Sequence, residues 1–222
     1  MPDVQYLGHA CFRLRGRDGT VVCDPFDRSV GYDMGHPIAH IVTVSHQHPD
    51  HNNVSAVKPA RERLFVIEGP GEYEVNNVLI TGVRTYHDKA KGAERGFNTV
   101  YVIHLDDVVF CHLGDLGHEL SQAQLEEIGS VDVLFIPVGG DETIGPAEAV
   151  SVISQLEPRP RIVIPMHYAA DQLTLEYQLA PLEKFLHELG VKESTAEEKL
   201  VVSASSLPAE GEPTRVVVMR VA

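Results

Sequence analysis

The chain has 222 residues, 43% of them hydrophobic, and a formal net charge of −14 at pH 7. These values predict a single globular domain over residues 1–222 and exclude a disordered chain. The acidic balance argues against a nucleic-acid-binding surface, and no apolar run is long enough to cross a bilayer. The first residues show no signal peptide and the three cysteines form no C-x-x-C pattern, so we expect a cytoplasmic protein with reduced thiols.

The start of the chain is predicted to be rich in β-structure. Strands are expected at 4–7 and 10–15, on either side of His9, and at 20–23, directly before Asp24. On the residues alone, Asp24 is explained as a turn residue before proline, and His9 as a core histidine with a satisfied hydrogen bond.

The next segment, I-V-T-V-S-H-Q-H-P-D-H, carries the strongest functional signal. Its β-branched start predicts a buried strand, which delivers three imidazoles and a carboxylate within six residues. Zinc and similar metals bind nitrogen and oxygen ligands of this kind. Alternate side chains of an extended chain share a face, so His46 and His48 can converge on one ion, while Asp50 and His51 face a second. The tight spacing favours this interpretation over a solvated histidine-rich loop.

Three later predicted strands also lead into His or Asp. The strand at 78–86 precedes His87, a hairpin over 98–111 leads to Asp115, and a late strand ends before His167. Each of these residues, taken alone, is also explained as an ordinary polar group at a strand end. The remaining predicted strands lie at 64–67, 131–138 and 161–166, the last being the late strand, and a closing strand pair is expected at 200–203 and 215–221. Helices are predicted at 52–58, at 121–128 with a capping box, from Pro146, and at 181–189.

These motifs together resemble a known family. H-x-H-x-D-H after an apolar strand is similar to the signature of metallo-β-lactamase fold hydrolases, and L-G-H-A-C-F and C-D-P-F resemble the branch that includes L-ascorbate-6-phosphate lactonase. The resemblance covers nearly the whole chain and implies an α+β fold, the four-layer αββα sandwich. One departure is Leu116, where many relatives have Thr or Ser after Gly-Asp.

The resemblance also implies a ligand set for two divalent transition-metal ions, with zinc expected and manganese or iron left open. The first ion would be bound by His46, His48 and His87, the second by Asp50, His51 and His167, and Asp115 would bridge them. The resemblance also implies that His9 and Asp24 lie near the site without binding metal, and whether His112 binds metal is left open. Arg95 and Asn98, which follow His87, and Thr143 are candidate substrate contacts.

The implied activity is hydrolysis of a small-molecule ester, lactone or phosphodiester by a hydroxide that the two ions activate, with Asp50 and Asp115 as catalytic carboxylates. No Ser or Cys nucleophile with a base partner is evident. Two alternatives stay open: an iron-dependent oxidoreductase on the same fold, and a non-catalytic metal-stabilised ligand-binding or sensor protein. A small-molecule substrate is expected, with neither nucleic acid nor membrane as partner, and a homo-oligomer is left open.

Overall fold

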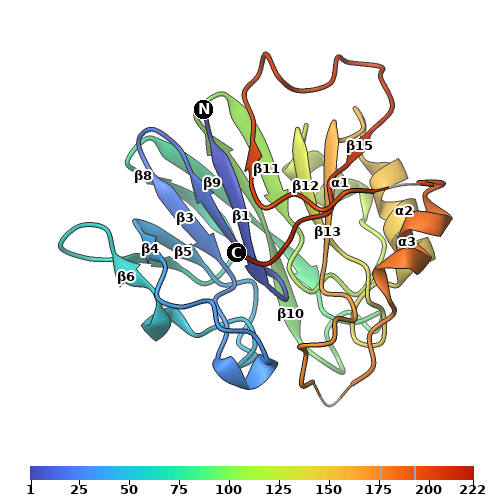
Figure 1. Ribbon diagram of the computed structural model, residues 1–222, viewed down its shortest axis with the longest axis horizontal. Helices are drawn as coiled ribbons and strands as arrows, with labels where there is room; N and C mark the ends of the chain where they lie inside the picture. The colour runs from blue at the N-terminus through green and yellow to red at the C-terminus, as the bar shows by residue number, and fades with distance from the viewer. Residues whose placement is uncertain (176, 193) are drawn as a thin grey trace.

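A computed structural model describes residues 1–175, 177–192 and 194–222 and shows two β-sheets packed face to face (Figure 1). The first sheet has six strands in the order β14-β1-β2-β3-β5-β7. Their bounds are β1 Asp3–Gly8, β2 Cys11–Arg15, β3 Thr20–Cys23, β5 Ile41–Thr43, β7 Phe65–Ile67 and β14 Leu200–Val201. A separate pair, β4 Ile38–Ala39 and β6 Lys58–Pro59, lies beside this sheet.

The second sheet has seven strands in the order β15-β13-β12-β11-β10-β9-β8. Their bounds are β8 Gly71–Val75, β9 Val78–Tyr86, β10 Phe97–Leu105, β11 Val108–His112, β12 Val133–Pro137, β13 Ile162–Met166 and β15 Arg215–Val216. Strands β8 to β11 are antiparallel hairpins, whereas β11, β12 and β13 run parallel. The parallel strands are buried runs without alternation, as expected for strands covered on both faces.

The main core lies between the sheets. It contains a group of aromatic rings: the ring of Phe12 from the first sheet lies 4.4 Å from that of Phe135 from the second, tilted by 41°, and Phe110 stacks on Phe135. All three side chains are at most 1% exposed. The burial of this apolar surface is the principal force that holds the two sheets together.

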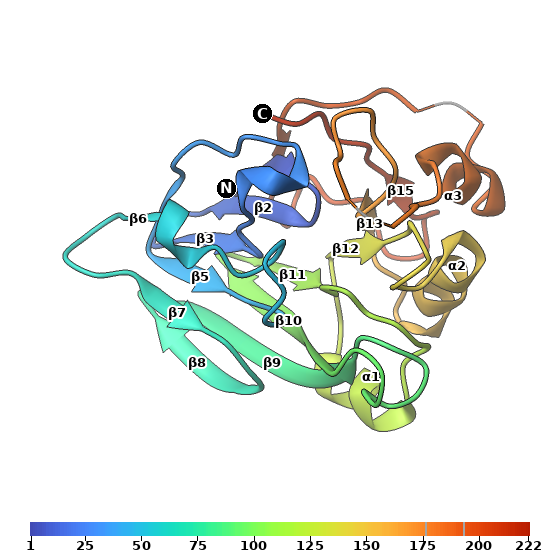
Figure 2. The ribbon, with the colours of Figure 1, turned by 90° about the horizontal axis from the view of Figure 1, so that it is seen from below.

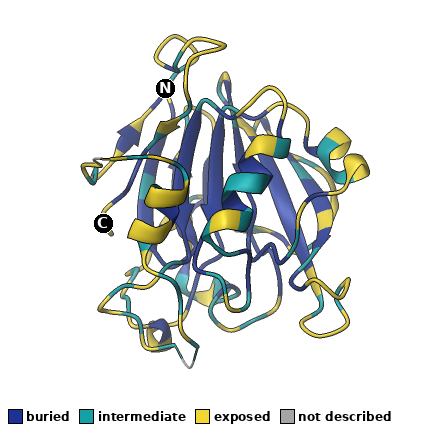
Figure 3. Ribbon diagram, turned by 90° about the vertical axis from the view of Figure 1, so that its right-hand side faces the viewer, coloured by how far each residue is buried: buried dark blue, intermediate teal, exposed yellow. Residues whose placement is uncertain are grey.

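The outer faces of the sheets are covered differently. Helices α1 Gln122–Ile128, α2 Pro146–Gln155 and α3 Leu182–Glu188 pack outside the second sheet and turn their polar faces to solvent (Figures 1 and 3). The first sheet is covered by loops and two short 3-10 helices, η1 Arg28–Val30 and η2 Val54–Ala56. The α+β sandwich is therefore confirmed, with short turns as its outer layer on one side. Within the described part of the chain, no helix is long and apolar enough to span a membrane.

The predicted pairing of the two closing strands is wrong. Strand β14 pairs with β1 in the first sheet, whereas β15 pairs with β13 in the second. Each has only two residues, and the chain between them crosses from one sheet to the other. Such short edge strands contain too little pattern to specify a partner, so nearness in sequence was a misleading guide.

The topology gathers the predicted ligands at one end of the sandwich. In the first sheet, β5 is parallel to β3 and β7 and ends shortly before His46. In the second, β11 ends shortly before Asp115, and β13 ends directly before His167. Because parallel strands present their carboxyl ends at the same edge, residues more than 100 positions apart meet there (Figure 2).

Candidate metal centre

The loop after β5 and the end of β9 form a first group of three imidazoles. His46 Nε2 lies 3.0 Å from His48 Nδ1, and the His87 ring lies 4.6 Å from that of His46 and 4.9 Å from that of His48. One ligand atom of each of the three lies within 4.8 Å of the others. This spacing suits one ion bound by three nitrogens.

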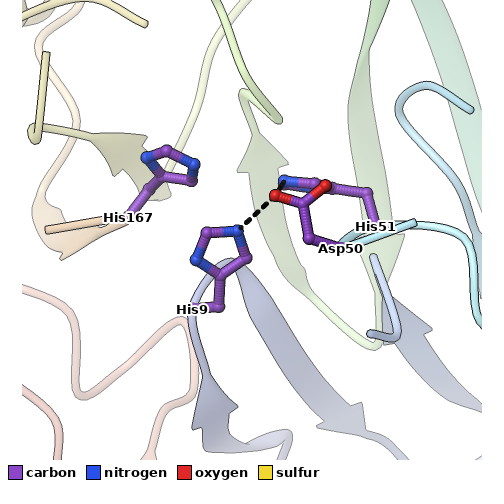
Figure 4. Close-up of side chains that lie close together, drawn as sticks. All are labelled: His9, Asp50, His51 and His167. Atoms are coloured by element: carbon purple, nitrogen blue, oxygen red, sulfur yellow. Dashed lines mark hydrogen bonds and ion pairs between the residues drawn. The ribbon is translucent and has the colours of Figure 1, made fainter. Parts of the chain in front are cut away.

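A second group surrounds Asp50 (Figure 4). It contains His51 from the same loop, His167 from the end of β13, and His9 from the turn between β1 and β2. His51 Nε2 lies 3.8 Å from Asp50 Oδ2, and the Tyr177 hydroxyl donates a hydrogen bond of 3.1 Å to the same oxygen. The three imidazoles are at most 1% exposed, so water does not compete for their nitrogens.

Asp115 lies between the two groups. Its Oδ2 is 3.2 Å from His87 Nε2 in the first group, and 3.3 Å and 3.4 Å from the Nε2 atoms of His51 and His167 in the second. The turn that places it requires glycine at position 114, where φ is +55° and a Cβ would lie 2.4 Å from the Asn98 amide oxygen. Asn98 in turn accepts a 3.0 Å hydrogen bond from the Asp115 backbone N–H.

Asp24 orients the imidazoles of His51 and His46, the first directly and the second through Ser45. Its Oδ2 accepts hydrogen bonds from His51 Nδ1 at 2.9 Å and from the Ser45 hydroxyl at 2.6 Å. Since the Ser45 hydroxyl donates to Asp24, it accepts from His46 Nδ1, 2.9 Å away. In the neutral form of each ring, Nδ1 therefore carries the proton and Nε2 faces the site as an acceptor, which is the tautomer a metal requires. The role expected for Asp24 agrees with this arrangement.

Protonation states follow from burial and from the crowding of charges. Burial lowers the pKa of His167 to about 3 and that of His46 well below its ordinary value, so both imidazoles are neutral. Burial also opposes a charge on His51, but Asp115, Asp24 and Asp50 together raise its pKa well above the ordinary value. For Asp115, burial raises the pKa, yet the neighbouring His167 and His51 lower it well below the ordinary value.

The residues at this site fit metal ions. Within the described chain, five of the imidazoles or carboxylates keep a buried atom with no hydrogen-bond partner: His9 Nδ1, His51 Nε2, His87 Nε2, His167 Nδ1 and Asp115 Oδ1. No described Lys or Arg forms an ion pair with Asp24, Asp50 or Asp115. Buried carboxylates and unpaired imidazole nitrogens without a cation are costly, and divalent metal ions resolve both problems.

Comparison with known proteins decides the family. The family model described as the beta-lactamase superfamily domain matches residues 3–167. The chain belongs to this superfamily. It is 30% identical over 193 residues to a UPF0173 metal-dependent hydrolase of Thermococcus onnurineus, covering 76% of this chain and 85% of that protein.

Solved structures agree with this membership. The chain is 38% identical, with a TM-score of 0.78, to a Thermotoga maritima protein assigned to the Zn-dependent hydrolases of the metallo-beta-lactamase superfamily, covering 99% of this chain and 98% of that one. A structure from Parabacteroides distasonis, 16% identical with a TM-score of 0.64, covers 97% of this chain and 91% of its own and shows the same fold.

Three other residues predicted near the site, His112, Thr143 and Asn98, form hydrogen bonds within the protein. Both ring nitrogens of His112 already have hydrogen-bond partners. Its Nε2 lies 2.8 Å from the Ala10 carbonyl oxygen, and its Nδ1 accepts from the Gly114 N–H. The Thr143 hydroxyl donates to carbonyls of its own loop. Asn98 as a substrate contact is wrong: it is fully buried, and its amide donates to Thr85 and to the Leu113 carbonyl.

Arg95 does line a cleft at the site. The cleft, of about 400 Å³, borders His46 and His48 and extends to Arg84 and Phe97. A larger cavity of about 790 Å³ lies at the opposite end of β12 and β13, near Asp132 and Glu212 and far from the metal ligands. Of these two cavities, the smaller one contacts candidate metal ligands, namely His46 and His48.

Sequence reasoning did not identify Tyr177 or the role of Glu142. Tyr177 stacks on His167 and donates to Asp50, while the Glu142 carbonyl accepts a 3.1 Å hydrogen bond from His87 Nδ1. A tyrosine in a long polar loop carries no spacing signal, and a backbone carbonyl carries no sequence signal at all. Both contacts arise only when distant loops close over the site.

Proposed function

We propose that this chain is a hydrolase that uses two divalent metal ions, with zinc preferred, to cleave a small-molecule ester, lactone or phosphodiester. His46, His48 and His87 would hold one ion, Asp50, His51 and His167 the other, and Asp115 both. The observation that supports this most directly is the position of Asp115 Oδ2, within 3.4 Å of imidazole nitrogens from both groups. Two such metal ions, when bound, would lower the pKa of a water molecule and polarise the bond to be cleaved.

Other residues of the chain hold the proposed metal ligands in position. Asp24 and Ser45 fix the rings of His46 and His51, the Glu142 carbonyl fixes His87, and Asn98 fixes the backbone of Asp115. The reacting bond would lie at the inner end of the cleft beside His48, and the rest of the substrate would lie toward Arg95. A volume of about 400 Å³ suits a small molecule.

The test is hydrolysis of one ester, one lactone and one phosphodiester before and after chelation and reloading with Zn²⁺. We expect at least one of the three classes to be cleaved, the activity to disappear with the chelator and to return with the metal. Asp115→Ala should abolish it, while Asp107→Ala, in the exposed β10–β11 turn, should leave it unchanged. Full activity of the Asp115→Ala protein, or of chelated protein, would refute the proposal.

A further inference from the structure

His9 has an unusual position for a residue predicted to lie only near the metals. Its backbone is left-handed, with φ of +55°, which is uncommon for a residue other than glycine. Two hydrogen bonds to its carbonyl maintain this conformation, from the Tyr6 hydroxyl at 2.8 Å and from the His167 N–H at 3.0 Å. Strained residues fixed in this way are concentrated at functional sites.

The fixed backbone directs the His9 ring at the second group (Figure 4). The ring is 1% exposed and lies 4.4 Å from the ring of His167 and 5.0 Å from that of His51. Its Nε2 faces Asp50 Oδ2, and its Nδ1 has no hydrogen-bond partner among the described residues. A core histidine with a satisfied hydrogen bond would make use of both nitrogens, so that explanation does not fit.

The distance between His9 and Asp50 distinguishes two roles. His9 Nε2 and Asp50 Oδ2 are 3.3 Å apart, whereas an imidazole that only orients a carboxylate makes a hydrogen bond of about 2.7–2.9 Å. Two neighbouring ligand atoms of a four- or five-coordinate zinc ion, each about 2.0–2.1 Å from it, lie roughly 2.9–3.6 Å apart, a range that includes this distance. The ligand atoms of His9, Asp50, His51 and His167 also all lie within 4.8 Å of one another.

We propose that His9 Nε2 is a direct ligand of the second ion, which rests on the two-metal function proposed above. The second site then has three imidazoles and Asp50, with Asp115 as an additional ligand. Such a crowded site leaves few open positions for substrate. The open positions are therefore at the first ion, whose ligands His46 and His48 border the cleft. Asp50 does not need His9 for orientation, because Tyr177 already donates to it.

Two substitutions of His9 separate the ligand role from an orienting role. His9→Gln keeps a side-chain N–H near the place of Nε2, so it can still donate to Asp50 but binds zinc poorly. His9→Asn tolerates the left-handed backbone and removes both functions. His187→Gln, on α3, is the matched control for the same chemical change. Thermal unfolding of the metal-free proteins checks that each variant folds.

The readout is Zn²⁺ and Co²⁺ binding to metal-free protein by calorimetry and visible absorbance. If His9 is a ligand, both His9 variants lose at least 100-fold in affinity for the second ion, retain the first, and change the Co²⁺ spectrum, while the control binds like the wild type. Wild-type affinity in His9→Gln with loss in His9→Asn would overturn the ligand role and leave an orienting one. A wild-type chain that binds fewer than two ions would overturn both this inference and the proposed function.

Discussion

At the scale of single residues, the site depends on side chains that orient the candidate metal ligands through hydrogen bonds. The Asp24 carboxylate is fully buried and has three donors, the Ser45 N–H, the Ser45 hydroxyl and His51 Nδ1. It fixes the tautomers of two histidines at once. From its sequence context alone, Asp24 is predicted to be a turn residue. Only the family resemblance predicts that it orients a histidine, because neither composition nor spacing shows which ring a carboxylate will face.

Replacement of Asp24 by Asn tests this arrangement. The amide nitrogen would face the donors at His51 Nδ1 or the Ser45 hydroxyl, so one ring would lose its orientation. We expect the affinity for the second ion to fall about 10–100-fold, with the first affected less. Calorimetric Zn²⁺ titration of the metal-free protein measures this. Affinities equal to those of the wild type would show that Asp24 only terminates the strand.

At the scale of elements, most strands and the three α-helices of the described residues could be predicted because each carries a local signal, whereas the helix predicted at 52–58 is only a 3-10 turn over Val54–Ala56. The capping box at Ser121 and the proline at the start of α2 are examples. What could not be predicted depends on distant contacts. The loop after His87 looked like an ordinary polar loop, yet Asp88 accepts four backbone N–H groups within it, from Ala90, Gly92, Glu94 and Arg95. This network fixes one edge of the cleft beside His46 and His48.

The start of α2 gives a pH-dependent prediction. Burial opposes the charge on Glu148, but Lys89 and the Gly145 N–H lower the pKa of its carboxyl below the ordinary value. Because the folded pKa is depressed, the stabilisation is complete above the unfolded pKa of about 4.3 and is lost as pH falls through the folded value. Glu148→Gln should therefore destabilise the protein by about 0.3–1 kcal/mol at pH 7, and by less below pH 4.

Urea unfolding of wild type and Glu148→Gln at pH 7, 5 and 3.5 measures this difference. Glu127→Gln, on the exposed side of α1, serves as the control and should show little difference at any pH. A Glu148→Gln difference that stays constant from pH 7 to 3.5 would contradict the ion-pair explanation.

At the scale of the whole molecule, the site exists only because two sheets pack together. The first sheet contributes His9, Asp24 and the His46–His51 loop, and the second contributes His87, Asp115 and His167. The order of the motifs along the chain predicted this convergence through the family resemblance. The left-handed backbone at His9 and the closure by Tyr177 could not be predicted, because they depend on packing between residues more than 100 positions apart.

The core between the sheets should therefore control both stability and metal binding. Phe135→Ala removes a fully buried ring that packs on Phe12 and lies 5.9 Å from the ring of His112, below the Asp115 turn. We expect a loss of about 3–5 kcal/mol in the free energy of unfolding. Phe97→Ala, whose ring is 58% exposed, should cost less than about 1 kcal/mol. Denaturant unfolding of the two variants measures the contrast, and equal losses would mean that the inter-sheet core is misassigned.

We propose that ligands from both sheets bind two metal ions and that Asp115 contacts both ions. The most direct test is the metal content per chain, measured by elemental mass spectrometry on protein purified without added metal and then equilibrated with Zn²⁺. We predict close to two ions per chain for the wild type and a loss of both in Asp115→Ala, with the fold retained. One ion or none in the wild type, or two ions in Asp115→Ala, would contradict the bridged two-metal centre.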